Sequence, residues 1–156
     1  MSEFLSIAHN DKHSRSSKTS ELGILGEEYA LNFLKSEGFD IIMANFKVPI
    51  GRNRVGTAVS GEIDLIAFEE DVLCFIEVKT RRSNDLSSAL SAVDLRKQRQ
   101  IIRIARRYRK IFRLNDQRIR FDVVSVLIEK KLPEIKLFRG FWNESKFHKR
   151  KWTGDY

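Results

Sequence analysis

The stretch Gly61-Glu-Ile-Asp-Leu-Ile-Ala67, with its continuation Cys74-Phe-Ile-Glu-Val-Lys-Thr80, decides the fold of this chain. It contains two apolar runs that are separated by the acidic pair Glu70-Asp71. Nearly continuous apolar runs of this length indicate strands that are covered on both faces. A two-residue turn between them predicts a hairpin. We therefore expect two adjacent strands near the centre of a sheet.

Four charged side chains interrupt this hairpin near its open end. If the acidic pair is the turn, Asp64 lies opposite Glu77, and Glu62 lies opposite Lys79, all on one face. Opposed carboxylates about 5 Å apart repel each other. A divalent cation with oxygen ligands between Asp64 and Glu77 would relieve that repulsion. The alternative is an ion pair between Glu62 and Lys79, with the two remaining acids at a solvated rim.

The whole chain has the composition of one globular domain. Its 156 residues are 42% hydrophobic and carry a formal charge of +8, which favours a polyanionic partner. One cysteine excludes a disulfide framework. We find no membrane-length apolar run and no signal peptide, so we expect a cytoplasmic protein. We divide the chain into a flexible polar N-terminal segment (1–18), the domain (19–143) and a basic, aromatic tail (144–156).

A first helix is predicted from Thr19 or Ser20 to about Ser36, before Gly38. Glu27 falls at the edge of its apolar stripe and could reach a site at the margin of the core. Alternatively, Glu27 serves only as an acid that complements the helix dipole.

A strand is expected over 39–48, followed by a long, glycine-punctuated connection over 49–60. Arg52 and Arg54 in this connection could hold phosphate, or they could lie at a solvated loop tip. Later in the chain, a strand over 120–128 precedes an edge strand over 135–138. Asp122 in the first of these is explained by pairing with a nearby arginine.

A second helix, capped by Asp94, should run to about Leu114. Its inner stripe is predicted to consist of Ile101, Ile104, Ala105, Tyr108 and Phe112. Lys97 lies on that stripe in the first turn, where a cation opposes the helix dipole. It therefore needs a carboxylate or phosphate partner, or else it extends to solvent.

The outer faces of the second helix carry many cations and no acid. Such a one-sided run repels itself and favours an anionic surface, through salt-sensitive and largely sequence-independent phosphate contacts. The residues expected to contact nucleic acid are Arg81, Arg82, Lys97, Arg99, Arg103 and Arg106.

The element order helix–strand–strand–strand–helix–strand, with Asp64, Glu77 and Lys79 spaced as D-x12-E-x-K, resembles the PD-(D/E)xK nuclease superfamily. Five blocks resemble the YraN-like bacterial family, which is similar in turn to archaeal Holliday-junction resolvases: Gly26-Glu27, Gly61–Ala67, Phe75–Arg81, Val93–Gln98 and Arg120–Val124. The resemblance covers roughly residues 20–143. It implies an α/β, restriction-endonuclease-like fold, with a mixed central sheet flanked by helices in the core order αβββαβ.

The resemblance also implies roles for individual residues. Asp64 and Glu77, with the backbone carbonyl of Val78, would hold Mg²⁺ or Mn²⁺. Lys79 would orient or deprotonate the attacking water, and Glu27 would contribute to the metal or its water shell. Lys97 would support the scissile phosphate or Glu77. Glu62 is a neighbour without an assigned role.

The expected function is a metal-dependent endonuclease that hydrolyses DNA, with branched or junction DNA among the expected substrates. Resolvases act as dimers on two-fold symmetric substrates, so the resemblance also allows a homodimer. Two other functions stay open. One is a non-catalytic nucleic-acid-binding protein that keeps the nuclease fold, and the other is an interaction module whose basic face binds RNA or an acidic protein.

Overall fold

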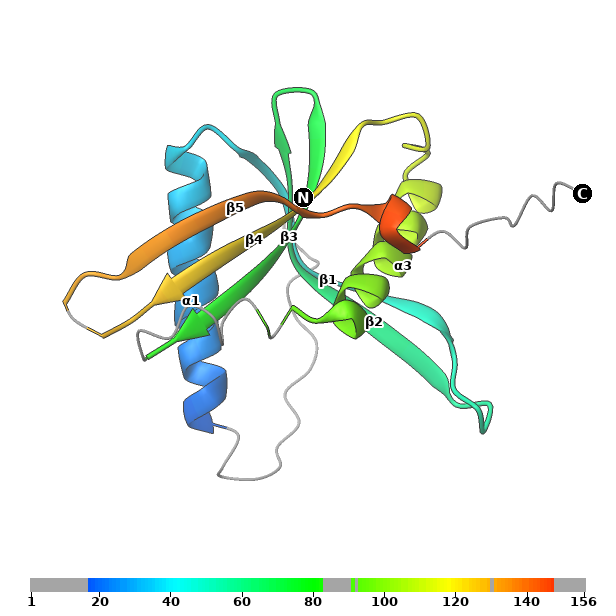
Figure 1. Cartoon of the computed structure of the whole chain (residues 1–156), viewed down its shortest axis with the longest axis horizontal. Coiled ribbons are helices and arrows are strands. Elements are labelled where there is room, and N and C mark those ends of the chain that lie inside the picture. The colour runs from blue at the N-terminus through cyan, green and yellow to red at the C-terminus, as the bar shows by residue number, and fades with distance from the viewer. Residues whose placement is uncertain (1–16, 83–90, 92, 130, 148–156) are drawn as a thin grey trace, which may run out of the picture.

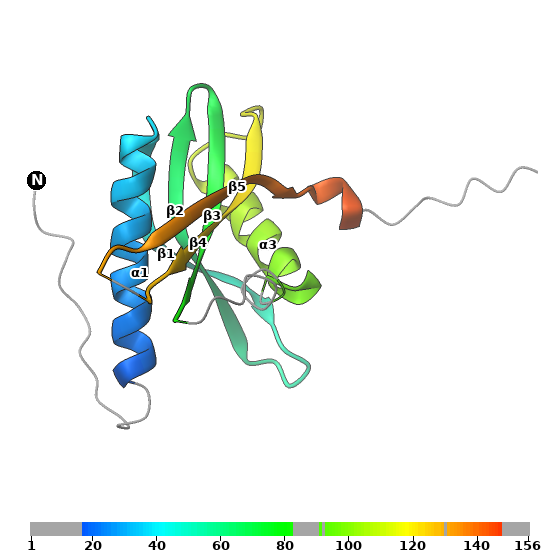
Figure 2. The ribbon, with the colours of Figure 1, turned by 60° about the vertical axis from the view of Figure 1, so that its left-hand side comes forward.

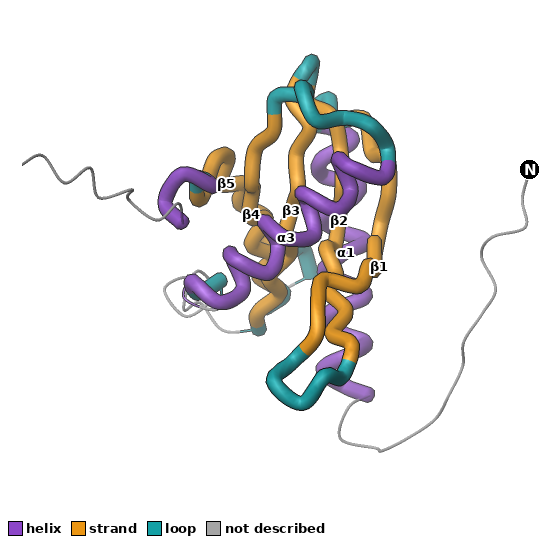
Figure 3. The backbone as a smooth tube through the Cα atoms, turned by 90° about the vertical axis from the view of Figure 1, so that its right-hand side faces the viewer, coloured by secondary structure: helices purple, strands orange, loops and turns teal. Residues whose placement is uncertain are grey.

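A five-stranded mixed sheet lies between two helices in the computed structural model, which describes residues 17–82, 91, 93–129 and 131–147. The elements in chain order are α1 (Ser17–Ser36), β1 (Asp40–Arg52), β2 (Ala58–Glu69), β3 (Val72–Arg81), α3 (Leu95–Ile111), β4 (Ile119–Leu127), β5 (Glu134–Trp142) and the 3-10 helix η1 (Glu144–Phe147). Helices α1 and α3 cover opposite faces of the sheet (Figures 1 and 3). The predicted α/β class and core order are confirmed.

The strands lie in the sheet in their sequence order, β1-β2-β3-β4-β5. Only β3 and β4 are parallel, and the chain between them contains α3, as a parallel connection requires. Strands β2 and β3 are buried where they pair at the centre of the sheet, over residues 65–67 and 73–78, as their apolar sequences predict. Strand β5 is an edge strand, as expected, but it is longer than predicted and reaches Trp142.

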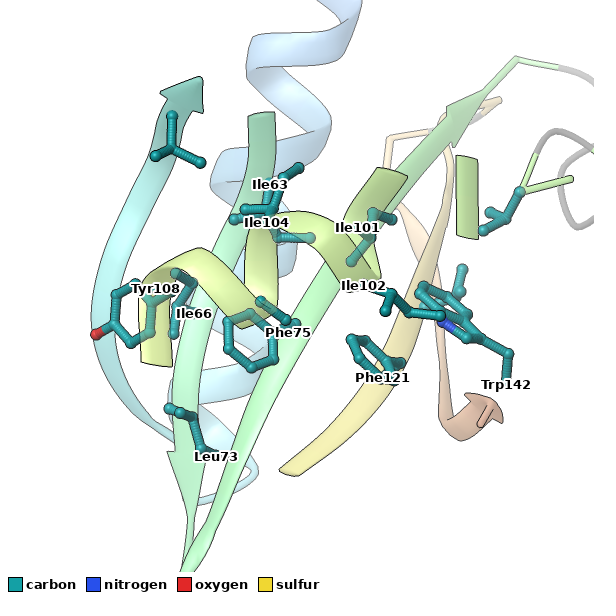
Figure 4. Packing of buried hydrophobic residues seen from close by; sticks show 14 residues of the cluster. Ile63, Ile66, Leu73, Phe75, Ile101, Ile102, Ile104, Tyr108, Phe121 and Trp142 are labelled. Carbon is teal, nitrogen blue, oxygen red and sulfur yellow. The ribbon is translucent and has the colours of Figure 1, made fainter. Parts of the chain in front are cut away.

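Each face of the sheet has its own hydrophobic core. Under α3, the side chains of Ile66, Phe75 and Phe121 pack against Ile101 and Tyr108 (Figure 4). Under α1, a second cluster joins the helix to the other face of the same strands through Ala30, Leu34, Leu65, Ala67, Cys74, Ile76, Val78, Val124 and Val126. Cys74 is buried and free, as its apolar surroundings predict.

The prediction of a long connection over 49–60 is wrong. Strands β1 and β2 continue through it and pair as far as Arg52 and Ala58, which leaves a tight turn over 53–57. The Asn53 side chain accepts hydrogen bonds from the backbone of Val55 and Thr57, at 3.1 and 2.9 Å, and closes this turn. Residues 51–60, which we call the arm, form an exposed extension that projects beyond the sheet (Figures 1 and 2).

Both helices follow the predicted spans closely, with differences at their ends. Helix α1 begins at Ser17 and ends at Ser36. Helix α3 is capped by Asp94 as predicted, but it ends at Ile111 rather than near Leu114, because Arg113 takes a left-handed conformation with φ of 54°. Phe112 is 45% exposed and does not belong to the buried stripe, since it lies beyond the last helical residue.

Asp122 is a structural acid, as predicted. It is fully buried and accepts two hydrogen bonds of 2.8 Å from Arg120 and one from the backbone of Gly140 in β5. Arg120 also meets Glu69, so this network ties β2, β4 and β5 together away from the open end of the hairpin.

Candidate active site

The candidate site lies where β2 separates from β3. The pairing follows the predicted register from Glu69/Val72 to Leu65/Ile76 and then stops. Beyond that point, the Asp64 carboxylate accepts a hydrogen bond of 2.7 Å from the backbone N–H of Val78. The Asp64 carboxylate therefore accepts the hydrogen bond that a backbone carbonyl of β2 would accept if the pairing of β2 and β3 continued.

The strand alternation of β2 also changes here. Ile63 and Ile66 both pack on the α3 side, whereas Leu65 packs on the α1 side. Regular alternation would place Ile63 and Leu65 on the same face, so the strand must twist sharply around Asp64. The chain then leaves β3 and continues beside β1 into the arm.

Glu77 is the buried acid of the site. Its side chain is 4% exposed, and its Oε1 atom lies 3.0 Å from Lys79 Nζ and 3.4 Å from Lys97 Nζ. The carboxylate partner predicted for Lys97 is therefore present. The predicted alternative, an ion pair between Glu62 and Lys79, does not form, because Glu62 pairs with Lys47 across β1 and β2 at 3.4 Å.

A close approach of α1 to β3 brings Glu27 to the same region. A Cβ atom on Gly26 would come within 2.7 Å of Thr80 Cγ2 and closer still to its Oγ1, so only glycine permits this packing. Glu27 follows directly in the helix and interacts electrostatically with Glu62 and Glu77. The sequence-based expectation that Glu27 reaches a site at the core margin agrees with this placement.

Sequence reasoning missed Asn45, which contributes to this cluster from β1. It lies between the pairs Ala44/Leu65 and Phe46/Ile63, which places it across from Asp64. Its φ of 52° is a left-handed conformation, which is uncommon for a residue other than glycine inside a strand. Its side-chain amide favours the ionised form of Glu27 and so opposes the rise in the pKa of that acid. Nothing in the local sequence marks Asn45, because its position depends on the bend of both strands.

The acids of the site destabilise one another's ionised forms. Burial, with added repulsion from Glu77, raises the pKa of Asp64 to about 8, although the bond from Val78 and the nearby Lys97 oppose this change. The pKa of Glu27 is also raised, first by burial and then by repulsion from Glu62. Two neighbouring acids with raised pKa values indicate a candidate functional site.

One oxygen of the site has no partner. Glu77 Oε2 is buried and accepts no hydrogen bond from the described residues, while Oε1 takes both lysines. Within the described ranges no group of three or more His, Cys, Asp or Glu side chains gathers as a ready-made metal cage. The arrangement instead offers two carboxylates, Asp64 and Glu77, which suits an ion that keeps several water ligands.

Several of the cations predicted to contact nucleic acid interact with other parts of the protein. Arg106 pairs with Glu144 at 2.6 Å, and Arg103 donates to the Ile50 carbonyl. Arg99 lies over the Phe147 ring, 5.3 Å from its centre, and Arg82 is exposed at the end of β3, beside half-buried Arg81. Several cations of α3 thus bind the protein itself, through contacts between distant segments that the helix sequence cannot reveal.

Arg52 and Arg54, whose role was left open, are exposed residues of the hairpin end. Arg52 donates a 2.7 Å hydrogen bond to the Gly56 carbonyl and so helps to close the turn. No described helix of the chain is both long and apolar enough to cross a membrane.

Comparison with known proteins places the chain in a family. The model described as "Uncharacterised protein family UPF0102" matches residues 26–126. A UPF0102 protein of Dictyoglomus thermophilum is 41% identical over 110 residues, which cover 70% of this chain and 85% of that protein. One of Acetivibrio thermocellus is 38% identical over 128 residues, which cover 82% and 92%.

A solved structure, described as the crystal structure of SSO0001, aligns with a TM-score of 0.39 and 16% identity. The alignment covers 83% of this chain and 55% of that one, so the chain spans about half the length of that protein. The family matches confirm the YraN-like relationship that the five sequence blocks predicted. The chain belongs to the uncharacterised protein family UPF0102.

Proposed function

We propose that this protein is a metal-dependent endonuclease that hydrolyses phosphodiester bonds in DNA, with a restriction-endonuclease-like fold of the PD-(D/E)xK type. The observation that carries this proposal is the pair Asp64 and Glu77 at the opening between β2 and β3. One of these acids has a raised pKa, and the other has a buried oxygen without a partner among the described residues. A pure binding surface gains nothing from such a pair.

Mg²⁺ or Mn²⁺ suits these donors, and Asp64, Glu77 and the Val78 carbonyl are the groups that would hold it. The N–H and C=O of one strand residue point toward the same neighbouring strand, so the Val78 carbonyl lies on the edge that faces Asp64. When bound, the ion would lower the pKa of a water molecule and stabilise the charge that develops on the phosphate.

The lysines have distinct roles in this proposal. Lys79, 3.0 Å from Glu77 and 21% exposed, would orient the attacking water and help to deprotonate it. Lys97 approaches Glu77 from α3 and would hold the scissile phosphate by charge. Glu27, which reaches the site because Gly26 packs on Thr80, would bond to water in the site.

One observation favours a different function, a nucleic-acid-binding protein without turnover. Both lysines approach Oε1 of Glu77, so the charge of this acid is balanced without any ion. In such a protein the acid would hold the two cations in place for phosphate binding. This alternative predicts DNA binding that is independent of divalent metal.

Calorimetric titration of Mn²⁺ and Mg²⁺ tests the proposal, together with a nicking assay on linear DNA, branched DNA and RNA. The wild type is compared with Glu77→Gln, which keeps the side-chain shape, and with Lys79→Ala. Glu134→Gln is the matched control, because Glu134 is an exposed acid whose ion pair among the described residues is with Lys136.

We expect the wild type and Glu134→Gln to bind metal and nick DNA, and Glu77→Gln to do neither. Lys79→Ala should bind metal without nicking. Absence of metal binding by the wild type, even with DNA present, would refute the nuclease proposal and favour the binding protein. Nicking that survives in Glu77→Gln would also contradict it.

A further inference from the structure

A groove of about 510 Å³ lies between the first half of α3 and the strands that lead into the arm. Its helical wall is strongly cationic, and its other wall contains the apolar side chains of Ile50 and Val59. The complete lining consists of Ile50, Val59, Asp94, Arg96, Lys97, Arg99, Gln100 and Arg103. Four cations therefore face one acid, and that acid already caps α3.

The part of β1 that leads into the arm is fastened to α3 by hydrogen bonds from arginine side chains to backbone carbonyls. Arg103 donates to the Ile50 carbonyl, and Arg107 donates to the Pro49 carbonyl at 3.3 Å. Gly51, with φ of 146°, makes room for this contact, because a Cβ atom there would lie 2.5 Å from the Arg103 guanidinium. The groove is thus formed before any ligand arrives, and it does not depend on closure of the arm.

Contacts within the protein engage the cations of α3 to different degrees. Arg103, Arg106 and Arg107 are bound to other parts of the protein. Arg96, Lys97 and Arg99 line the groove near the start of the helix, where Lys97 also contacts Glu77 and Arg99 lies over the Phe147 ring. Arg96 is exposed, and no ion pair with another described residue engages it.

Lys97 connects the groove to the candidate active site. It lines the groove and also lies 3.4 Å from Glu77. A chain of phosphates that follows Arg99, Arg96 and Lys97 would therefore arrive beside the acid pair.

We propose that this groove binds the phosphate backbone of the DNA strand next to the phosphate that is cut. The proposal rests on the proposed nuclease function for its position, and it adds the path of the substrate. Arg96 and Arg99 contact successive phosphates, while Ile50 and Val59 contact the sugars. The groove offers no described array of base-reading groups, so binding is independent of sequence.

The test compares Arg96→Ala/Arg99→Ala with Lys110→Ala/Arg113→Ala. The control removes the same charge from two exposed positions, one in the last turn of the same helix and one just beyond its end. Lys110 lies about 21 Å from Arg96 along the axis, at 1.5 Å of rise per residue. Both pairs keep the arginines that hold the arm. DNA affinity is measured in EDTA as a function of salt, for single-stranded and duplex DNA, with heparin as a non-nucleic polyanion.

We expect the groove pair to lower the slope of log K against log salt by about 1.5, because each lost phosphate contact removes about 0.7 to 0.9 from it. The control pair should leave the DNA slope unchanged. Equal losses of salt slope for both pairs would overturn the proposal, because any exposed cation of the protein would then contribute equally to DNA binding. The same would follow if the groove pair weakened heparin binding alone.

Failure of the nuclease proposal can be distinguished from failure of the groove proposal. Binding in EDTA does not require metal, whereas the calorimetric titration with Glu77→Gln requires no DNA. A wild type that binds no metal but loses salt slope with the groove pair would reject the enzyme and keep the groove. Metal binding and nicking by the wild type, with a salt slope that the groove pair leaves unchanged, would keep the enzyme and reject the groove.

Discussion

Replacing Asp64 with asparagine should stabilise the metal-free protein at pH 8. The substitution removes one of two neighbouring acids, and the asparagine oxygen can still accept the hydrogen bond from Val78. In the wild type, burial and repulsion by Glu77 raise the pKa of Asp64 to about 8. The folded protein therefore opposes ionisation of this group.

The sign and size of the effect follow from proton linkage. Because the folded protein holds this proton more tightly than the unfolded chain, the associated stability is complete below the ordinary pKa of 3.8 and is lost as pH rises through about 8. Each unit by which folding displaces the pKa of Asp64 corresponds to about 1.4 kcal/mol, so the upper bound on the stability that the substitution can gain is about 6 kcal/mol. Solvent screens a carboxylate that is partly exposed, so we expect a gain of about 2 kcal/mol.

Urea unfolding in EDTA, followed by circular dichroism between pH 4 and pH 9, measures this difference. The two proteins should be nearly equal in stability at pH 4, and the variant should gain on the wild type up to pH 8. Adding Mn²⁺ should stabilise only the wild type, by about 2.7 kcal/mol at one hundred times the dissociation constant.

Asp122→Asn is the contrasting control. Asp122 is fully buried and bonded by Arg120, so its replacement removes one of the two carboxylate partners of this half-buried arginine and should cost about 3 kcal/mol. Equal stability of the wild type and Asp64→Asn at pH 8 would refute the reasoning. A difference that does not change with pH would also refute it, because ionisation would then not be the cause.

Substitutions at three positions, Gly26, Asn45 and Gly61, test the packing and the backbone conformation around the site by the same unfolding measurement. Gly26→Ala should cost about 1–3 kcal/mol of stability, because the added Cβ atom collides with Thr80. The affinity for Mn²⁺ should also fall, because Glu27 moves with the helix. Unchanged stability would argue against the tight contact between helix and strand. Asn45→Gly should be tolerated within about 1 kcal/mol, whereas Asn45→Val should cost about 1–2 kcal/mol, because only the latter is strained at φ of 52°; equal effects would exclude the left-handed conformation. Gly61→Ala should cost about 1–3 kcal/mol by contact with Ile104, 2.8 Å away, and Ile104→Val in the same chain should restore part of that loss if the contact is the cause.

The sequence by itself determined the hairpin of β2 and β3 and its register. Apolar runs on either side of Glu70-Asp71 specify two covered strands, and a two-residue turn leaves one pairing. The cap at Asp94 and the carboxylate partner of Lys97 could be predicted for a similar reason, since both follow from the start of one helix. These features depend on residues that are close in the chain.

Only the tertiary structure decided where that hairpin opens. The pairing of β2 and β3 ends at Leu65, where the Asp64 carboxylate accepts the hydrogen bond of the Val78 N–H, whereas β2 stays paired with β1 as far as Ala58. Asn45 enters the site through the same bend, and the arm replaces a predicted connection because two weakly patterned segments pair with each other. Local sequence carries little signal for such long-range pairing.

The cations of α3 illustrate the same limit. Their sequence predicts one basic surface, but the fold brings backbone carbonyls of β1 against the second half of the helix and a glutamate against Arg106. Those arginines become part of the structure, and only the first half of the helix remains to line a groove. Charge is determined by the sequence, whereas its availability to a partner depends on which distant groups the fold places within reach.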